Sequence, residues 1–145
     1  MTDAVSDYVT DDHSRCDHLL GACEAALAAK DWTAADQAFP MLRDAILRHF
    51  SMEEEVLFPE IEERNPVAAG PAGVMRMEHQ QMRQILSELE QALGRRSRAT
   101  CLGAIETINM LAQQHNAKEE GILYPLADDI LSTGGEALIV RMKGI

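Results

Sequence analysis

An eleven-residue pattern occurs twice in the chain, as HFSMEEEVLFP over residues 49–59 and as HNAKEEGILYP over residues 115–125. Each copy begins with histidine, and a glutamate, Glu53 or Glu119, follows four residues later. Residues four apart lie on the same face of an α-helix, so each copy presents an imidazole and a carboxylate side by side. Iron, manganese and zinc favour this combination of ligands, and two copies in one small chain indicate one shared metal site.

The segments that carry these ligands are predicted to be helices. Strong helix-breaking sequences occur at residues 30–31, 65–73 and 94–98, and they divide most of the chain into four segments. In every segment apolar residues recur at alternating steps of three and four, which is typical of helices packed nearly antiparallel in a bundle. We therefore expect an all-α fold, an antiparallel up-down-up-down four-helix bundle over residues 1–131.

Two prolines and the end of the chain interrupt this pattern. Pro59 and Pro125 are expected to kink or stop their helices, because proline lacks the backbone N–H that an interior helical position donates. On the fourth helix the apolar row is expected to continue past Glu119 to Ile122. Residues 132–145 are expected to form a C-terminal extension, in which the run ALIVRM predicts either a helical turn or a strand.

Each predicted helix has a histidine on its apolar face. On the first helix, His13 lies in the same arc as the apolar residues, counted at about 100° per residue, whereas His18 points to the opposite side. His13 and His49 lie at equal distances on either side of the first turn, so antiparallel packing brings both to one height. The second pair of helices repeats this relation with His79 and His115.

Together the two helix pairs provide six candidate metal ligands. They are His13, His49, Glu53, His79, His115 and Glu119. A single buried histidine is more often a hydrogen-bonded core residue. Burying four imidazoles and two carboxylates at one level, however, costs several kcal/mol of folding free energy per uncompensated charge. A bound cation would offset this cost. The glutamates that follow, Glu54, Glu55 and Glu120, are expected to be solvated or to hydrogen-bond the ligating imidazoles.

Six ligands suit two metal ions better than one. If Glu53 and Glu119 bridge, each ion receives two imidazoles and two carboxylate oxygens. A shared oxo or hydroxo group adds a fifth ligand and leaves one position open for a small molecule. The order His-x-x-x-Glu also differs from the Glu-x-x-His of ferritin-like di-iron bundles.

The composition argues against several other classes of function. The chain has 145 residues, which suits one domain, and its 24 acidic and 13 basic residues give a net charge of -11. That charge disfavours nucleic acid and anionic membranes as partners. No apolar run reaches the ~18 residues of a membrane span, and the acidic start differs from a secretion signal, so we expect a cytoplasmic protein. The three cysteines, an odd number without a CxxC pair, are expected to be reduced thiols.

Over nearly its whole length, from His13 to Pro125, the chain resembles hemerythrin-like proteins of the HHE cation-binding group. The motifs that carry the resemblance are DH at residues 12–13, HFSMEEEVLFP, GPAGVMRMEH ending at His79, and HNAKEEGILYP. The resemblance implies a four-helix bundle around a non-haem di-iron centre that meets oxygen, nitric oxide or peroxide. It also implies that the six candidate ligands bind the iron.

Two features separate the chain from particular members of that group. Oxygen-carrying hemerythrins have a second histidine on the third helix, four residues after the first, where this chain has Arg83. Its four histidines and two glutamates are more similar to the ligands of bacterial proteins that repair damaged iron-sulfur centres, although those proteins have an additional N-terminal cysteine-containing domain.

We therefore expect a protein that binds or senses oxygen, nitric oxide or peroxide, rather than a dedicated enzyme. Redox chemistry or repair of damaged iron-sulfur or di-iron centres is the alternative. Two iron ions are the expected cofactor, and zinc and manganese suit the same ligands. A homodimer, or a sensor that works through a protein partner, is expected to use residues 132–145.

Overall fold

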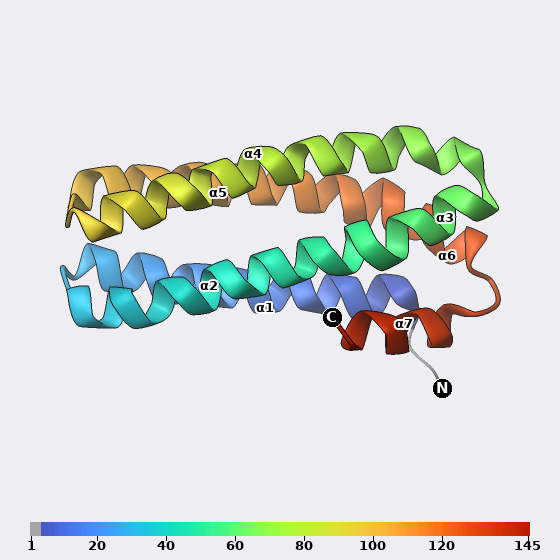
Figure 1. The fold of residues 1–145 in the computed structure, drawn as a ribbon, viewed down its shortest axis with the longest axis horizontal. Coiled ribbons are helices and arrows are strands. Elements are labelled where there is room, and N and C mark those ends of the chain that lie inside the picture. The colour runs from blue at the N-terminus through green and yellow to red at the C-terminus, as the bar shows by residue number, and fades with distance from the viewer. Residues whose placement is uncertain (1–3) are drawn as a thin grey trace.

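The computed structural model describes residues 4–145, which are almost entirely helical. In chain order the elements are α1 (Val5–Ala28), α2 (Trp32–Met52), the π-helical turn η1 (Glu53–Leu57), α3 (Phe58–Arg64), the 3₁₀ turn η2 (Pro66–Ala68), α4 (Ala69–Gly94), α5 (Arg98–Lys118), the π-helical turn η3 (Glu119–Leu123), α6 (Tyr124–Ile130) and α7 (Gly135–Lys143). The helices α1, α2, α4 and α5 run side by side and antiparallel (Figure 1), so the predicted all-α four-helix bundle is confirmed.

The bundle consists of two helical hairpins with matching turns. Lys30, between α1 and α2, and Arg96, between α4 and α5, have positive φ angles of 57° and 55°. The N–H of Lys30 donates to the carbonyl of Leu27, and the N–H of Arg96 donates to that of Leu93. Because a left-handed residue closes each hairpin in the same way, residues at equal distances from the two turns lie at matching heights.

Apolar side chains fill the bundle on both sides of a polar layer. One buried cluster lies toward the two turns and includes Leu27, Leu89 and Ile105. The other lies toward α3, α6 and α7 and includes Ile61 and Met142. The buried polar and charged side chains of residues 4–145 come from the level between them: His13, His49, Glu53, His79, His115 and Glu119.

Each of the two glutamates in this layer begins a π-helical turn. In η1 the N–H of Phe58 donates to the carbonyl of Glu53, and in η3 the N–H of Tyr124 donates to that of Glu119. These bonds span five residues instead of four, so each turn holds one more residue than an α-helical turn. Such insertions are frequent at functional sites.

The two prolines do not end the helical path. Pro59 and Pro125 are the second residues of α3 and α6, where a missing N–H costs little. The extra residue in η3 changes which side of the chain faces the core. Ile122 is 64 % exposed, whereas Leu123 is 1 % exposed. The predicted apolar row through Ile122 was therefore wrong, because it assumed an uninterrupted α-helical period.

The break between the second and third bundle helices is shorter than expected. Residues 65–73 were expected to be non-helical, but α4 already begins at Ala69. Pro71 lies in its first turn, where the N–H groups have no partner within the helix and proline is tolerated. The remaining turn is held by Asn65, whose side chain accepts a hydrogen bond from the N–H of Val67.

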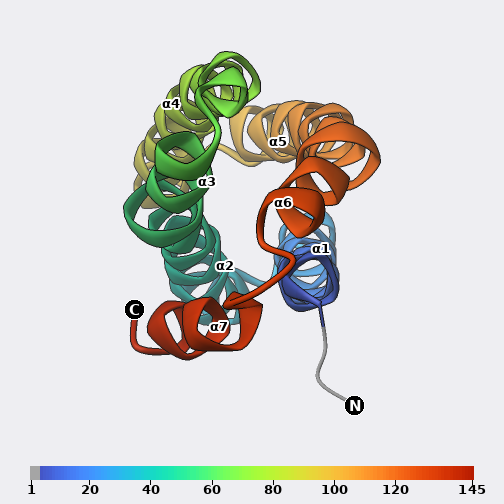
Figure 2. The same ribbon diagram turned by 90° about the vertical axis from the view of Figure 1, so that its right-hand side faces the viewer.

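The C-terminal run ALIVRM is helical and forms most of α7. This helix packs beside α1 and η1 at the end of the bundle away from the hairpin turns (Figure 2). Leu138 and Met142 are buried in the second apolar cluster. Of the two readings that the sequence left open, a helix is therefore correct and a strand is not.

None of the helices formed by residues 4–145 combines the length and the apolar character that crossing a bilayer requires.

Candidate metal centre

The six candidate ligands lie at one level of the bundle and are shielded from solvent. Their exposed fractions are 5 % for His13, 3 % for His49, 2 % for His115 and 0 % for Glu53, His79 and Glu119. His18, in contrast, is exposed. The helical geometry that placed His13 on the inner face of the first helix is thus confirmed.

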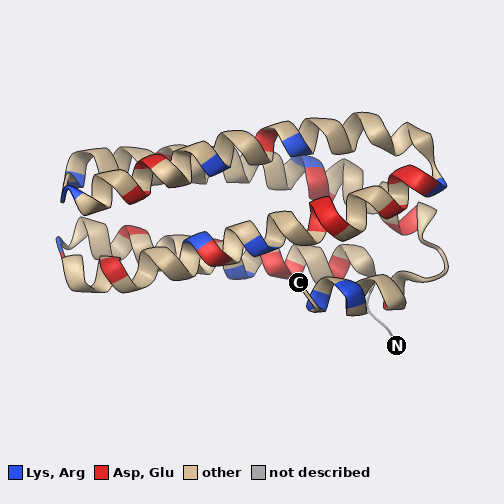
Figure 3. Ribbon diagram, viewed as in Figure 1, with Lys and Arg blue, Asp and Glu red and all other residues tan. Residues whose placement is uncertain are grey.

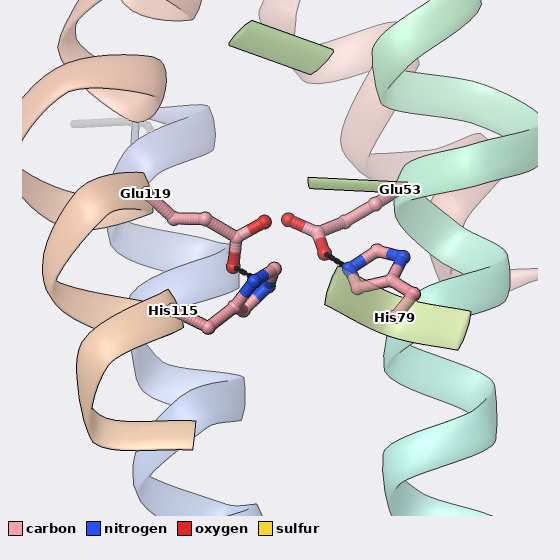
Figure 4. Close-up of side chains that lie close together, drawn as sticks. All are labelled: Glu53, His79, His115 and Glu119. Atoms are coloured by element: carbon pink, nitrogen blue, oxygen red, sulfur yellow. Dashed lines mark ion pairs between the residues drawn. The ribbon is translucent and has the colours of Figure 1, made fainter. Parts of the chain in front are cut away.

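The donor atoms form two groups that share Glu119. One group takes an atom each from Glu53, His79, His115 and Glu119, all within 4.8 Å of one another. Figure 4 shows its two carboxylates facing each other with an imidazole beside each. The other group takes atoms from His13, His49 and Glu119 within the same distance. Atoms bound to one metal at about 2.1 Å lie at most about 4.2 Å apart, so each group needs only small shifts to surround an ion.

Both glutamates lie between the two histidine pairs. Glu119 Oε1 is 2.9 Å from His13 Nε2 and 3.1 Å from His115 Nε2. Glu53 Oε1 is 3.4 Å from His49 Nε2 and 3.1 Å from His79 Nε2. The ring centroids within a pair are 4.5 Å apart for His13 and His49, and 4.9 Å apart for His79 and His115. Each carboxylate therefore contacts one imidazole of each pair, as a bridging ligand would.

The other ring nitrogen of every imidazole faces a carboxylate. The Nδ1 pairs are His13 with Glu120 at 3.0 Å, His49 with Asp12 at 2.8 Å, His79 with Glu54 at 2.5 Å, and His115 with Glu78 at 2.9 Å. A proton held at Nδ1 leaves a lone pair at Nε2 and fixes the ring toward the centre. Glu54 and Glu120 thus take the imidazole-binding role that the sequence allowed, whereas Glu55 is exposed.

Acidic residues are grouped on η1 and the segments around it (Figure 3).

Burial alone would raise the pKa of Asp12, but hydrogen bonds, the largest from His49, outweigh burial and lower that pKa to about 2. Burial likewise opposes ionisation of Glu54, yet hydrogen bonds from His79 and Arg83 lower its pKa to about 2. Both carboxyl groups are therefore charged at neutral pH and act as strong acceptors for the imidazole N–H.

The centre contains buried polar atoms with no hydrogen-bond partner. They are Glu53 Oε1, His79 Nε2, His115 Nε2 and Glu119 Oε2. His79 Nε2 and Glu53 Oε1 are 3.1 Å apart but are not aligned for a hydrogen bond. Each such atom costs about 1–3 kcal/mol, and a coordinated cation would remove that cost. The mixture of imidazole and carboxylate donors fits iron, manganese or zinc.

Tyr124 also reaches the centre, which sequence reasoning did not predict. Its hydroxyl oxygen lies 2.7 Å from Glu53 Oε2 and 3.0 Å from Glu119 Oε1, so its single proton can be donated to either carboxylate. Burial, together with the charges of these two carboxylates, raises the pKa of Tyr124 well above its usual value. The only sequence signal was the aromatic position of the doubled pattern, where the first copy has Phe58.

Asp12 and Glu78 were visible in the sequence as acid-histidine pairs, but their partners were not. Asp12 binds His49 on the other helix of its hairpin instead of its neighbour His13, and Glu78 binds His115. Adjacent residues on a helix point in different directions, so sequence adjacency does not identify the partner.

Arg83 replaces the second histidine that oxygen-carrying hemerythrins have on the third helix. Its guanidinium donates to Glu54 Oε1 at 2.9 Å and lies 5.2 Å from the centre of the Phe50 ring. Arg83 therefore supports the carboxylate that orients His79 instead of contributing a ligand.

A small cavity of about 30 Å³ adjoins the centre on the side of the hairpin turns. Its wall includes His13, Cys16, Ile46, His49, Ala112 and Asn116. The volume suffices for a water or a diatomic molecule. Cys16, Ala112 and Asn116 are partly exposed, so the cavity approaches the surface between α1 and α5. Burial raises the pKa of the Cys16 thiol to about 11, so this thiol is protonated at neutral pH and is a poor nucleophile.

Comparison with known proteins agrees with this geometry. Residues 4–127 match the Hemerythrin HHE cation binding domain family. No curated protein and no solved structure matches the chain. The matched region contains both hairpins, both π-turns and all six buried histidines and glutamates. The family match and the buried cluster of candidate ligands together indicate a metal-binding protein. The chain therefore belongs to the hemerythrin HHE cation-binding domain family.

Proposed function

We propose that this protein is a non-haem di-iron protein that binds or senses oxygen, nitric oxide or peroxide. The observation that carries the proposal is the pair of histidine groups around two shared glutamates, in which four buried donor atoms have no hydrogen-bond partner. Two iron ions bound there would supply redox chemistry and coordination positions open to a small molecule.

The chain's own residues hold these donors in place and keep the centre dry. The carboxylates at each Nδ1 orient the imidazoles, and apolar clusters close the bundle above and below the polar layer. The adjoining cavity of about 30 Å³ has room for a molecule of the size of water or a diatomic gas. These features support a small molecule as the partner of the metal ions.

The alternative is redox chemistry or repair of damaged iron-sulfur or di-iron centres. The ligand set of four histidines and two glutamates supports this alternative. Repair would need labile iron and accessible redox chemistry, whereas the six candidate ligands are at most 5 % exposed. The burial therefore favours binding or sensing of a small molecule.

Metal analysis and optical spectroscopy test the proposal. Protein purified from iron-supplied cells should contain about two irons per chain, and its spectrum should change on addition of oxygen, nitric oxide or peroxide. A His79→Ala variant should lose iron, whereas the matched His18→Ala variant should retain it, because His18 is exposed.

Two results would contradict this function. Zinc or manganese at full occupancy from iron-supplied cells would rule out a native di-iron centre. Iron-loaded protein with no spectral response to any of the three molecules would rule out their binding. Restoration of a nitrosylated iron-sulfur enzyme by the same iron-loaded protein would instead support repair.

A further inference from the structure

The two hairpins differ in one side chain that reaches the metal centre. They correspond residue by residue at an interval of 66 positions, as Glu53 corresponds to Glu119, and at this interval Phe58 corresponds to Tyr124. Both aromatic residues are buried and begin the short helix that follows a π-turn. Tyr124 stacks on His13 with ring centroids 5.5 Å apart, and Phe58 stacks on His79 at 6.0 Å. The hydroxyl of Tyr124 therefore has no counterpart in the other half of the centre.

Four candidate donor atoms surround this hydroxyl. Its oxygen is 2.7 Å from Glu53 Oε2, 3.0 Å from Glu119 Oε1, 3.1 Å from His13 Nε2 and 3.3 Å from His49 Nε2. His13 Nε2 also lies 2.9 Å from Glu119 Oε1, and His49 Nε2 lies 3.4 Å from Glu53 Oε1, so both ring nitrogens and both carboxylates converge on the same point as the phenol oxygen. A hydroxyl has one proton and can donate to only one of the two carboxylates, so the phenol oxygen has more close polar neighbours than its own hydrogen bond requires.

The distances match those between neighbouring ligands of one metal ion. In an octahedral site with bonds of about 2.1 Å, adjacent ligand atoms lie about 3 Å apart, and each ligand has four such neighbours. The Tyr124 oxygen has four neighbours at 2.7–3.3 Å. Its place is thus that of a fifth donor, on the side of α6, opposite the cavity near the hairpin turns.

We propose that Tyr124 is a metal ligand whose phenol oxygen coordinates the ion held by His13 and His49. The ion held by His79 and His115 has Phe58 at the corresponding place and receives no phenol, so the two ions are chemically different. This assignment rests on the di-iron function proposed above. When the oxygen coordinates, its proton passes to solvent and the oxygen–metal bond takes its place, because a bound cation favours the anionic form of a ligand.

Spectroscopy of the ferric protein tests this assignment. A phenolate bound to iron(III) gives a visible charge-transfer band, and excitation in that band enhances tyrosine ring vibrations in the Raman spectrum; phenylalanine gives neither. We expect both signals in the wild-type protein and their loss in Tyr124→Phe. Tyr8→Phe is the matched control, because Tyr8 is the only other tyrosine and its hydroxyl contacts Met52 Sδ at 3.9 Å instead of a candidate ligand.

Metal affinity separates a ligand from a packing residue. Loss of the Tyr124 oxygen should lower the affinity for the ion held by His13 and His49 at least ~10-fold, the lower end of the effect of losing a group that only supports a ligand. The affinity for the second ion should be nearly unchanged. Circular dichroism of Tyr124→Phe checks that the helices are intact. Equal weakening of both ions would show a packing role and overturn the assignment.

Failure of this assignment can be told apart from failure of the proposed function. Wild-type protein that holds two irons without a tyrosinate signal would overturn the role of Tyr124 and leave the di-iron function standing. If the protein does not take up iron, zinc can be titrated instead while phenolate formation is followed by ultraviolet difference absorption. Absence of a change that depends on Tyr124 would then overturn the assignment, and its presence would support a phenol ligand in a centre that is not di-iron.

Discussion

The four carboxylates that face the imidazoles differ in exposure, and we expect their contributions to metal affinity to follow that difference. Their side chains are 10 % exposed for Asp12, 19 % for Glu78, 23 % for Glu54 and 40 % for Glu120. A hydrogen bond to a charged group contributes about 1.5–3 kcal/mol when it is buried, whereas an exposed ion pair contributes about 0–1 kcal/mol. Asp12 and Glu120 are thus the two extremes of a series within one centre.

In the structure, Asp12 Oδ2 lies 2.8 Å from His49 Nδ1. Replacing Asp12 with asparagine removes the negative charge but keeps an acceptor oxygen at this position. The loss of a supporting carboxylate of this kind typically weakens metal binding ~10–100-fold, or about 1.4–2.8 kcal/mol. We expect Asp12→Asn to lie in that range. Glu120→Gln should lower metal affinity by less than about ten-fold, because solvent already screens the charge of Glu120.

Competition with a chromogenic chelator measures both affinities. Asp11→Asn is the matched control, since Asp11 is exposed and its replacement makes the same change in net charge one residue away. It should leave metal affinity unchanged. If Glu120→Gln weakened binding as much as Asp12→Asn did, burial would not determine the contribution of these carboxylates. If Asp11→Asn also weakened metal binding to the same extent, net charge alone would explain the effect of all three substitutions.

Three further predictions follow from the same geometry. His13→Ala should reduce metal content while His18→Ala retains it, and equal metal content in the two proteins would remove His13 from the ligand set. Ala112→Ile, which introduces the residue found at the corresponding position of the other hairpin, should fill the cavity and slow nitric oxide binding in stopped-flow mixing without loss of metal; an unchanged rate would mean that the gas enters elsewhere. In chelator-treated protein, the low pKa of Asp12, about 2 against 3.8, stabilises the fold above about pH 4, and this contribution is lost as the pH falls through 2. The difference between wild type and Asp12→Asn in urea unfolding should therefore fall from about 2 kcal/mol near pH 6 toward zero near pH 2, and a difference independent of pH would refute this origin.

Much of the fold could be predicted because the sequence carries two strong local signals. Apolar periodicity identified the bundle helices, and the equal spacing of His13 and His49 about the first turn predicted one height for both. The structure brings all six candidate residues together at that height. Periodicity failed at Ile122, because a π-turn depends on five-residue hydrogen bonds, such as that from the Tyr124 N–H to the Glu119 carbonyl, which no pattern of residue types reveals.

Contacts between helices were harder to predict. Asp12 was visible as the neighbour of His13, but its hydrogen bond to His49 depends on how α1 and α2 are rotated against each other. The hydroxyl of Tyr124 was missed for a related reason. An aromatic residue before proline usually packs in a core, and only the rotation of α6 after η3 shows that this one reaches the centre.

The π-turns also determine how this centre can change over evolution. In η3, the turn lies between Glu119 at its start and Tyr124 just after its end, and no atom outside the local backbone approaches Gly121 within 4 Å of where a Cβ would lie. Because the π-turn holds one residue more than an α-helical turn, deleting one residue there would restore an α-helical turn and leave the phenol of Tyr124 facing the centre, since the segments on both sides would keep their orientation. A change of length by one residue could thus be absorbed inside the turn without moving the phenol or any metal-contacting glutamate or histidine. Single-residue insertions and deletions at these turns are therefore expected to preserve the chemistry of such bundles, and substitutions at the aromatic position are expected to change it.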